Sequence, residues 1–245
     1  MNRRRMINKP SRRKLYEYVV EEIGFRIMNG DIQPGETFPN EDALCEEFGV
    51  SRGVLREATK VLSQKGLIQA RPKTGTMVRQ RRNWNLFDAD VLIWKLKAGD
   101  KLLFLQDVTE VRCIIESEAA RYAAQRARRD EVEIIQRCYD LLNETLADAS
   151  KYDYETYLEA DMAFHTAILD ACHNELLAQI GNTMRQAVQT ARKADIRDLK
   201  VLRDSLPFHL DMLRAIARQD PTAAHDAARD MFDQVWRSIP RRSAV

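Results

Sequence analysis

Residues 40–78, NEDALCEEFGVSRGVLREATKVLSQKGLIQARPKTGTMV, decide the fold of the first third of this chain. Asn40 can cap an apolar-periodic segment that ends at Gly49. Ser51 can cap a second such segment, which runs to about Lys65. Two short helices joined by a tight turn form a helix-turn-helix. The sequence therefore predicts this motif, preceded by one further helix.

The second helix of the motif has a basic side and an apolar side. At about 100° per residue, Arg52, Arg56 and Lys60 fall within an arc of about 80°. The apolar residues on the other side are Val54, Leu55, Ala58, Val61 and Leu62. A recognition helix needs this arrangement, because the apolar side packs on the domain and the basic side meets the DNA groove. We expect the arginines to bind guanine edges and Lys60 to contact phosphate.

The following segment decides between a recognition helix and an ordinary surface helix with solvated arginines. Residues 67–71 alternate like a short strand, 72–75 form a turn, and 76–78 form a second strand. A hairpin with a basic tip directly after the helix is typical of a wing. Gly75 would let the backbone approach a phosphate or the minor groove closely. The first third therefore predicts a winged helix-turn-helix.

This region resembles the GntR family of bacterial transcription regulators. The resemblance rests on the motifs GDIQPG (30–35), FPNE (38–41), GVSRGVLREA (49–58), Leu62, GLI (66–68) and Gly75-Thr76. With the helix geometry, it gives these expected DNA-binding residues: Ser51, Arg52, Gly53, Arg56, Lys60, Lys73, Thr74 and Gly75. Members of the family often carry a basic residue where this chain has Asp42, and an acid there repels phosphate. The resemblance implies a palindromic operator in double-stranded DNA as a partner.

Composition favours a soluble, mainly α-helical protein of 245 residues, with 9 Gly, 7 Pro and a net charge of +2. Residues 1–82 hold 17 Lys and Arg against 10 Asp and Glu, a basic balance that suits DNA or a solvated tail. We expect no transmembrane helix and no signal peptide, because the sequence has no long apolar run. Four cysteines without zinc-finger spacing fit a reducing cytoplasm.

The remaining residues, 83–245, predict a second domain that is all-helical. Periodic apolar segments occur at about 86–97, 102–127, 130–149, 152–172, 174–192, 205–218 and 221–239. These segments give about seven helices and no strand, and the polar stretch 193–204 predicts a loop or a frayed helix. The fold class is therefore mainly α, with a winged helix-turn-helix domain at 1–82 and a helical bundle at 83–245.

Three of these helices place charged or polar residues at the centre of apolar arcs. Asp161 and His165 share one arc, His209 lies in another, and Arg112 with Glu116 lies in a third. Buried charge is costly unless it is paired or coordinated. The Asp and the two His could share a divalent metal, beside which an arginine could clamp a carboxylate. Simple local pairs, of Asp with His and of Arg with Glu, would explain the same positions.

This second region resembles the FCD domain, the helical ligand-binding domain of the FadR subfamily. The matching residues are 110–112, Glu116, 159–161, 164–165, 167–168, Asn174, His209 and 215–216. The resemblance implies that Asp161, His165 and His209 hold zinc, manganese or nickel, and that Arg112, Glu116 and Asn174 bind a small carboxylate. The family's fourth ligand, a His, aligns with Met231, whose thioether suits hard cations poorly, and His225 lies on another side of that helix. Three protein ligands with water or effector, or no metal at all, remain as alternatives.

Residues 83–94, NWNLFDADVLIW, are similar to those of galactonate-responsive members of the family, which implies a sugar acid as effector. The sequence thus predicts a bacterial transcription regulator, a repressor that binds its operator as a homodimer and leaves it when the effector binds. Two other hypotheses stay open. The helical domain could serve dimerisation alone, or a metal site could activate water in an enzyme, although no general base is evident outside the ligand set.

Overall fold

The structure, a computed structural model, describes residues 12–71, 75–99, 101–192 and 199–238. The described chain is mainly helical, with ten α-helices, one 3-10 helix and one two-stranded sheet. The elements are α1 (Arg12–Asn29), α2 (Glu41–Phe48), α3 (Arg52–Gln64), β1 (Ile68–Arg71), β2 (Gly75–Val78), η1 (Arg81–Asn83), α4 (Ala89–Ala98), α5 (Lys101–Arg126), α6 (Arg129–Ala147), α7 (Tyr154–Ala171), α8 (Glu175–Arg192), α9 (Leu199–Ala217) and α10 (Pro221–Ser238). Contacts divide the chain into two compact units, here called the first unit, up to Gly99, and the helical unit after it.

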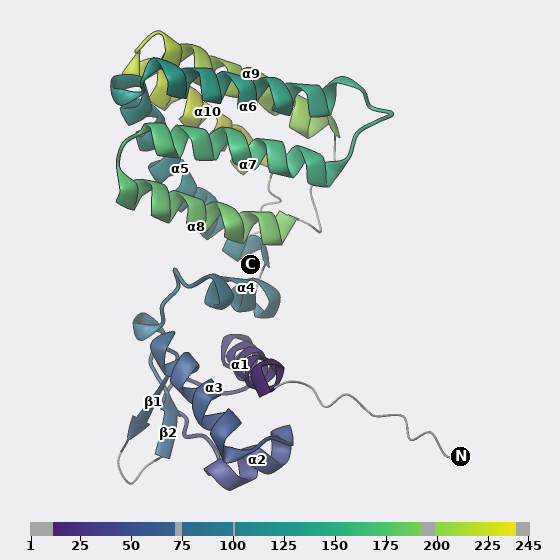
Figure 1. Ribbon diagram of the computed structural model, residues 1–245, viewed down its shortest axis with the longest axis vertical. Helices are drawn as coiled ribbons and strands as arrows, with labels where there is room; N and C mark the ends of the chain where they lie inside the picture. Colours follow the sequence, from purple (N-terminus) through teal and green to yellow (C-terminus); the bar gives the residue numbers. More distant parts are fainter. Residues whose placement is uncertain (1–11, 72–74, 100, 193–198, 239–245) are drawn as a thin grey trace, which may run out of the picture. The chain divides into compact units, whose positions relative to one another are not determined.

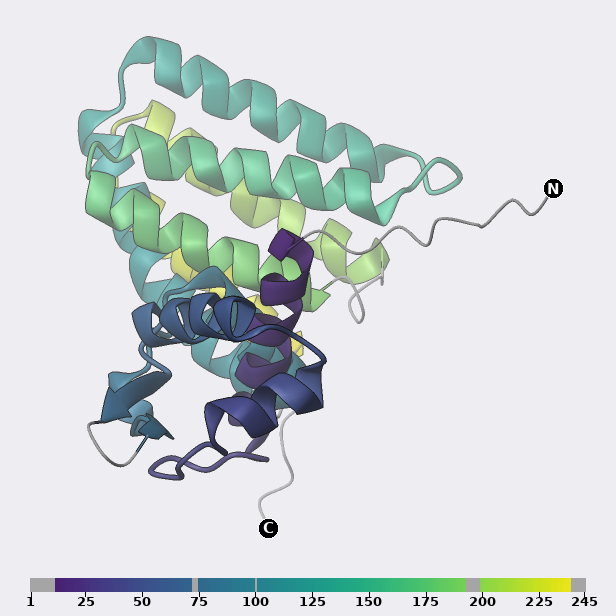
Figure 2. The same cartoon turned by 60° about the horizontal axis from the view of Figure 1, so that its bottom comes forward.

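The core of the first unit forms where α1 packs on α3 and α4. The predicted apolar stripe of α1 is buried through Val19, Ile23 and Ile27, and these residues share one cluster with Leu55 and Leu62 of α3. Figure 1 and Figure 2 both show α3 between α2 and the β-hairpin. The apolar side of α3 is therefore fixed in the core and leaves its opposite side exposed.

The two strands of the first unit form an antiparallel hairpin. Its register pairs Ile68 with Val78 and Arg71 with Gly75. Gly66 turns the chain from α3 into β1 with a φ of +75°, a left-handed conformation that glycine adopts without strain. A Cβ at this position would also lie 2.5 Å from the carbonyl oxygen of Asn83. These features establish the predicted winged helix-turn-helix.

Helix α4 packs within the first unit, whereas the sequence predicts a domain boundary between residues 82 and 83. Trp94 of α4 is buried in the core of the first unit, and Gly24 of α1 leaves room for its ring, with which a Cβ would collide. Lys65, directly after α3, pairs with Asp88 at the start of α4 at 2.7 Å. These contacts are long-range in sequence, which is why the local patterns did not reveal them.

The helical unit is organised around α5, which contacts α7, α8, α9 and α10. Figure 1 shows α6, α7 and α8 next to one another, and α6 also packs on α9. Helix α9 begins at Leu199, inside the stretch 193–204 that the sequence predicts to be a loop or a frayed helix, and Leu202 is buried in the core. Residues 193–198 lie outside the described residues. None of the described helices is long and apolar enough to cross a membrane.

Candidate functional site

Helix α3 exposes the basic side that the sequence predicts. Its buried residues are Val54, Leu55, Ala58 and Leu62. The side chains of Arg52, Arg56 and Lys60 are exposed, and Gly53 is half-buried in the first turn. Ser51 caps the helix, since its Oγ accepts a hydrogen bond from the backbone N–H of Val54 at 3.4 Å. Five expected DNA-binding residues therefore lie on one exposed helix or at its cap.

Carboxylates from the first turn of α2 pair with both arginines of α3. Nη2 of Arg52 lies 2.7 Å from Oδ1 of Asp42. Arg56 donates from Nε to Oε1 of Glu41 at 2.7 Å and from Nη2 to Oε2 at 3.3 Å. The hydrogen bond from Arg56 holds the pKa of Glu41 below its usual range. The acid that the sequence singles out, Asp42, is thus in direct contact with an expected base-reading residue.

The wing borders the same surface. Lys73 and Thr74, both expected to bind DNA, lie outside the described residues. Gly75 begins β2 with a φ of +85° and is exposed. A hollow between α2, α3 and the hairpin is lined by Phe38, Pro39, Asn40, Glu41, Leu44, Leu55, Arg56, Thr59, Gly75 and Thr76. The recognition helix and the start of β2 therefore border one concave surface.

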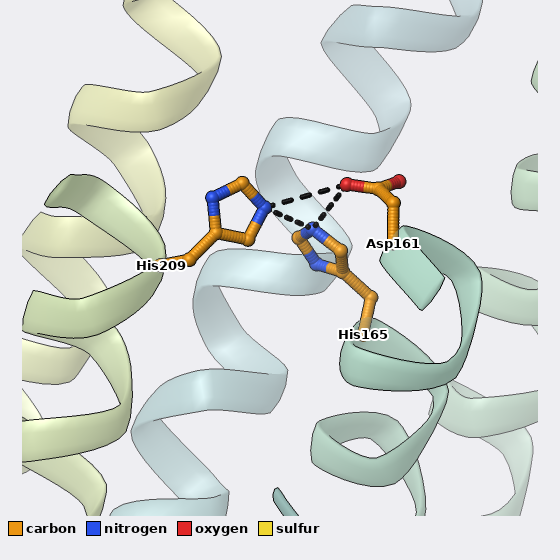
Figure 3. A group of neighbouring side chains, drawn as sticks. All are labelled: Asp161, His165 and His209. Carbon is orange, nitrogen blue, oxygen red and sulfur yellow. Dashed lines mark hydrogen bonds and ion pairs between the residues drawn. The ribbon is translucent and has the colours of Figure 1, made fainter. Parts of the chain in front are cut away.

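In the helical unit, Asp161 and His165 of α7 and His209 of α9 converge in the core (Figure 3). The Nε2 atoms of the two histidines lie 3.2 Å apart. Oδ1 of Asp161 is 3.4 Å from Nε2 of His209 and 3.7 Å from Nε2 of His165. All three side chains are buried. The structure thus brings together three residues that lie up to 48 positions apart in the sequence.

Each imidazole of this group is oriented by an acceptor at its other nitrogen. Nδ1 of His209 lies 2.9 Å from the carbonyl oxygen of Ser205, and Nδ1 of His165 lies 2.9 Å from Oε2 of Glu116. When a ring is neutral, the acceptor at Nδ1 places its proton there and leaves a lone pair on Nε2. Two lone pairs and one carboxylate oxygen therefore face one another, an arrangement that suits a shared divalent cation.

Two buried arginines surround the group. Glu116 accepts a hydrogen bond from Nε of Arg112 at 2.7 Å and another from Nη1 of Arg185 at 2.9 Å. Arg185 also donates to Oδ2 of Asp161 at 3.0 Å. The guanidinium of Arg112 lies 5.1 Å from the ring centre of Phe232. The charged network therefore connects α5, α7 and α8 inside the helical unit.

Sequence reasoning missed Arg185, although the signal that identified Arg112 is also present here. Arg185 is 1% exposed. At about 100° per residue it lies in an arc with Ala178, Gly181 and Met184, which are small or apolar. A charged residue in such an arc predicts burial with a partner. The same test applied to α8 would have added this second cation to the site.

Burial and neighbouring charge set the protonation states of the group. Burial raises the pKa of Glu116, but the attraction of Arg112 and Arg185 outweighs it and holds the pKa well below its usual range. Burial also raises the pKa of Asp161, but nearby positive charge, including that of Arg185, opposes it and the pKa is well below its usual range. Burial, helped by Arg185, lowers the pKa of His165 to about 4. At neutral pH the carboxylates are charged and His165 is neutral, as metal ligation requires.

The other residues considered for this site are Asn174, Met231 and His225. Asn174 is exposed, and its Oδ1 accepts a hydrogen bond from the N–H of Leu177 at 3.1 Å, as a helix cap does. Met231 is buried on α10. His225 is half-buried, with Nδ1 3.0 Å from Oδ1 of Asp226. Among the described histidines, cysteines and acidic residues, the group that could hold a metal ion comprises the two histidines and the aspartate drawn in Figure 3.

Comparison with known proteins identifies the family. The model of bacterial regulatory proteins of the gntR family matches residues 15–78, and the FCD domain model matches residues 107–234. The chain is 34% identical over 224 residues to the galactonate operon transcriptional repressor of Escherichia coli (strain K12), covering 90% of this chain and 95% of that protein. The chain belongs to the GntR family of bacterial regulatory proteins.

Further relatives of this GntR-family chain agree with that assignment. The Glc operon transcriptional activator of Escherichia coli (strain K12) is 29% identical over 236 residues, covering 94% of this chain and 91% of the relative. The solved structure of Lar, which controls the agr system of Listeria monocytogenes, has a TM-score of 0.59 at 19% identity over 94% of this chain and 98% of that one, and supports the fold. The GntR-family chain is a DNA-binding transcription regulator and not an enzyme.

Proposed function

We propose that this GntR-family regulator is a cytoplasmic repressor that binds a palindromic operator as a homodimer and leaves it when a small carboxylate binds the helical unit. The observation that carries the proposal is the buried group of Asp161, His165 and His209 beside Arg112 and Arg185. A sugar acid is the proposed carboxylate, because the relative at 34% identity is a repressor of a galactonate operon.

Charge balance in the buried group favours an anionic ligand. Arg112 and Arg185 are cations, Glu116 and Asp161 are anions, and the His165 imidazole is neutral, so these five side chains sum to zero charge. A divalent cation between the acceptors would add two positive charges to a buried site. A carboxylate would offset this excess, and guanidinium N–H groups bind carboxylates in a bidentate geometry.

Asp161, His165 and His209 would hold the metal, with zinc, manganese and nickel all compatible with two imidazoles and one carboxylate. When bound, the metal would supply positive charge and open coordination positions for a carboxylate. Glu116 and the Ser205 carbonyl would keep the two rings oriented. The buried thioether of Met231 is a poor ligand for such ions, so three protein ligands are proposed.

A thermal-shift screen tests the sensor. Purified protein is screened against sugar acids, hexuronates and dicarboxylates, with and without zinc or manganese. One acid should raise the melting temperature only with metal, because a ligand specific to the native state stabilises it. His209→Ala should abolish that shift, whereas His225→Ala should retain it. No shift from any acid on metal-loaded protein would favour a helical unit that serves dimerisation alone.

The response of the operator complex tests the repressor assignment. Wild-type protein should release a selected operator duplex in an anisotropy titration when the stabilising acid is added. Arg112→Ala should bind the duplex as the wild type does but need far more acid for release, since it lacks one buried guanidinium. Unchanged release by the variant would remove Arg112 from the proposed effector site.

A second copy of this chain is the proposed occupant of an apolar face on α5 and α8. Ile114 of α5 is 69% exposed, and Leu176 of α8 is 73% exposed. The two helices pack on each other, and exposed apolar patches are typical of interfaces. Ile114→Asp or Leu176→Asp should shift the mass found by light scattering from dimer to monomer. Ile134→Asp on α6 is the control, and a dimer that survives both test variants contradicts this face.

A further inference from the structure

The DNA-binding surface contains acidic residues where it would be expected to contain only cations and polar groups. Asp42 and Glu41 begin α2, directly after the cap Asn40, whose Oδ1 accepts a hydrogen bond from the N–H of Ala43. Their carboxylates reach across to α3 and pair with Arg52 and Arg56. Two acid–arginine pairs therefore lie on the surface that is expected to face DNA.

A contribution to folding stability does not explain the pair between Arg52 and Asp42. The side chains of Arg52 and Asp42 are 64% and 70% exposed. Ion pairs at this level of exposure contribute little to folding, because water and salt screen the attraction and both side chains lose freedom. We therefore expect Asp42 to affect the binding of a ligand to this surface rather than the folding of the unit.

A carboxylate at this place acts differently on the two parts of DNA. Phosphates carry a full negative charge and bind Arg52 by the same charge attraction as Asp42, so Asp42 competes with them for Arg52. A guanine edge is uncharged and offers two acceptors in the major groove. Asp42 binds Arg52 at one terminal nitrogen, Nη2, and the guanidinium has five N–H donors, so others remain for a base. The pair therefore weakens phosphate contacts more than base contacts.

We propose that Asp42 is a specificity-determining residue of the DNA-binding surface, which holds Arg52 for a base edge and suppresses binding to DNA of unrelated sequence. Asp42 is a positioning residue, because it acts through Arg52. The proposal rests on the DNA-binding activity of the family and needs neither the metal nor the effector.

The test compares Asp42→Asn with the wild type in the full chain. A preferred duplex is first selected with wild-type protein from a random pool, and affinities for it and for a scrambled duplex are measured by anisotropy at several salt concentrations. Asp42→Asn should bind the scrambled duplex about 5-fold more tightly, and the slope of log affinity against log salt should steepen by about one phosphate contact. The preference for the selected duplex should fall by about the same factor.

Two controls separate this role from a general charge effect and from a folding defect. Glu46→Gln makes the same change of charge at an exposed position of the same helix and should leave both affinities within about 2-fold of the wild type. In an Arg52→Ala background, Asp42→Asn should lose most of its effect. Equal gains from both acid variants, or an unchanged preference in a well-folded Asp42→Asn protein, would overturn the proposal.

Discussion

Arginine–carboxylate pairs occur in both units of the chain at the same distance and with opposite exposure. Arg52 and Asp42 in the first unit are 2.7 Å apart with side chains 64% and 70% exposed, whereas Arg112 and Glu116 in the helical unit are 2.7 Å apart and 5% exposed. Distance alone therefore says little about what a pair does. The partners of an exposed pair can separate and bind a ligand such as DNA instead. The partners of a buried pair must stay together and can hold other groups in place.

The largest effect is expected from breaking the buried network. Arg185→Met should lower the unfolding free energy of the helical unit by about 3–5 kcal/mol, because Glu116 and Asp161 each lose a donor and remain buried as anions. Urea unfolding followed by circular dichroism, with chelator present, measures the loss. Arg214→Met, which changes an exposed pair on α9, is the matched control and should change the free energy far less. Equal losses from the two variants would contradict the contrast between buried and exposed pairs.

The second-largest effect is expected to be a loss of folding stability at acidic pH, and it comes from the titration of the buried group. The pKa of His165 is lowered to about 4, whereas an unfolded imidazole titrates near 6.5. The unfolded chain therefore binds a proton first, and the unfolding free energy falls as the pH drops from about 6.5 to 4. The loss is up to about 3 kcal/mol, and Glu116 and Asp161, whose pKa values are lowered, add losses in the same direction at lower pH.

Urea unfolding at a series of pH values in chelator measures this dependence. His165→Gln removes the titrating ring, so the profile of the variant should be flatter between pH 6.5 and 4 than that of the wild type. A wild-type free energy that is constant over this range would show that His165 is not buried as a neutral ring.

The first unit could be predicted from sequence because its signals are local. Asn40 and Ser51 cap α2 and α3 as expected, and Gly66 ends α3 with a positive φ. The packing of α4 could not be predicted in this way. It depends on Trp94 fitting over Gly24, a contact between residues 70 positions apart.

The buried site could be predicted only in part, because some of its contacts join residues that are distant in the sequence. A polar residue within an apolar arc predicts burial, and this pattern identifies Asp161, His165 and His209 from the sequence alone. It could not show that Glu116 orients His165, because that contact depends on how α5 packs against α7. Pairing across helices is a property of the assembled core rather than of any one segment.

The exposed surface can be examined through DNA binding, where the expected effects are smaller. Arg56→Ala should reduce discrimination at one base pair by roughly 5- to 150-fold, because one bidentate contact to a base edge is lost. Lys60→Ala should instead weaken binding to all duplexes alike and lower the salt slope by about one phosphate contact. Titrations against duplexes that differ at single positions separate the two results. Loss of discrimination from both variants would show that Lys60 also reads a base.

The smallest expected effect is on the stability of the exposed pair itself. Arg52→Met should change the unfolding free energy of the first unit by no more than about 0.5 kcal/mol, because its partner Asp42 returns to water without a desolvation penalty. Any change should vanish at 1 M salt, where the screening length is about 3 Å. The unfolding free energy is measured at 0.1 and 1 M salt. Arg112→Met, which breaks the buried pair, is the comparison, and its loss of stability should persist at 1 M salt. A large, salt-resistant loss from Arg52→Met would mean that this pair is structural, and the exchange of Arg52 between Asp42 and DNA would then be too costly to govern recognition.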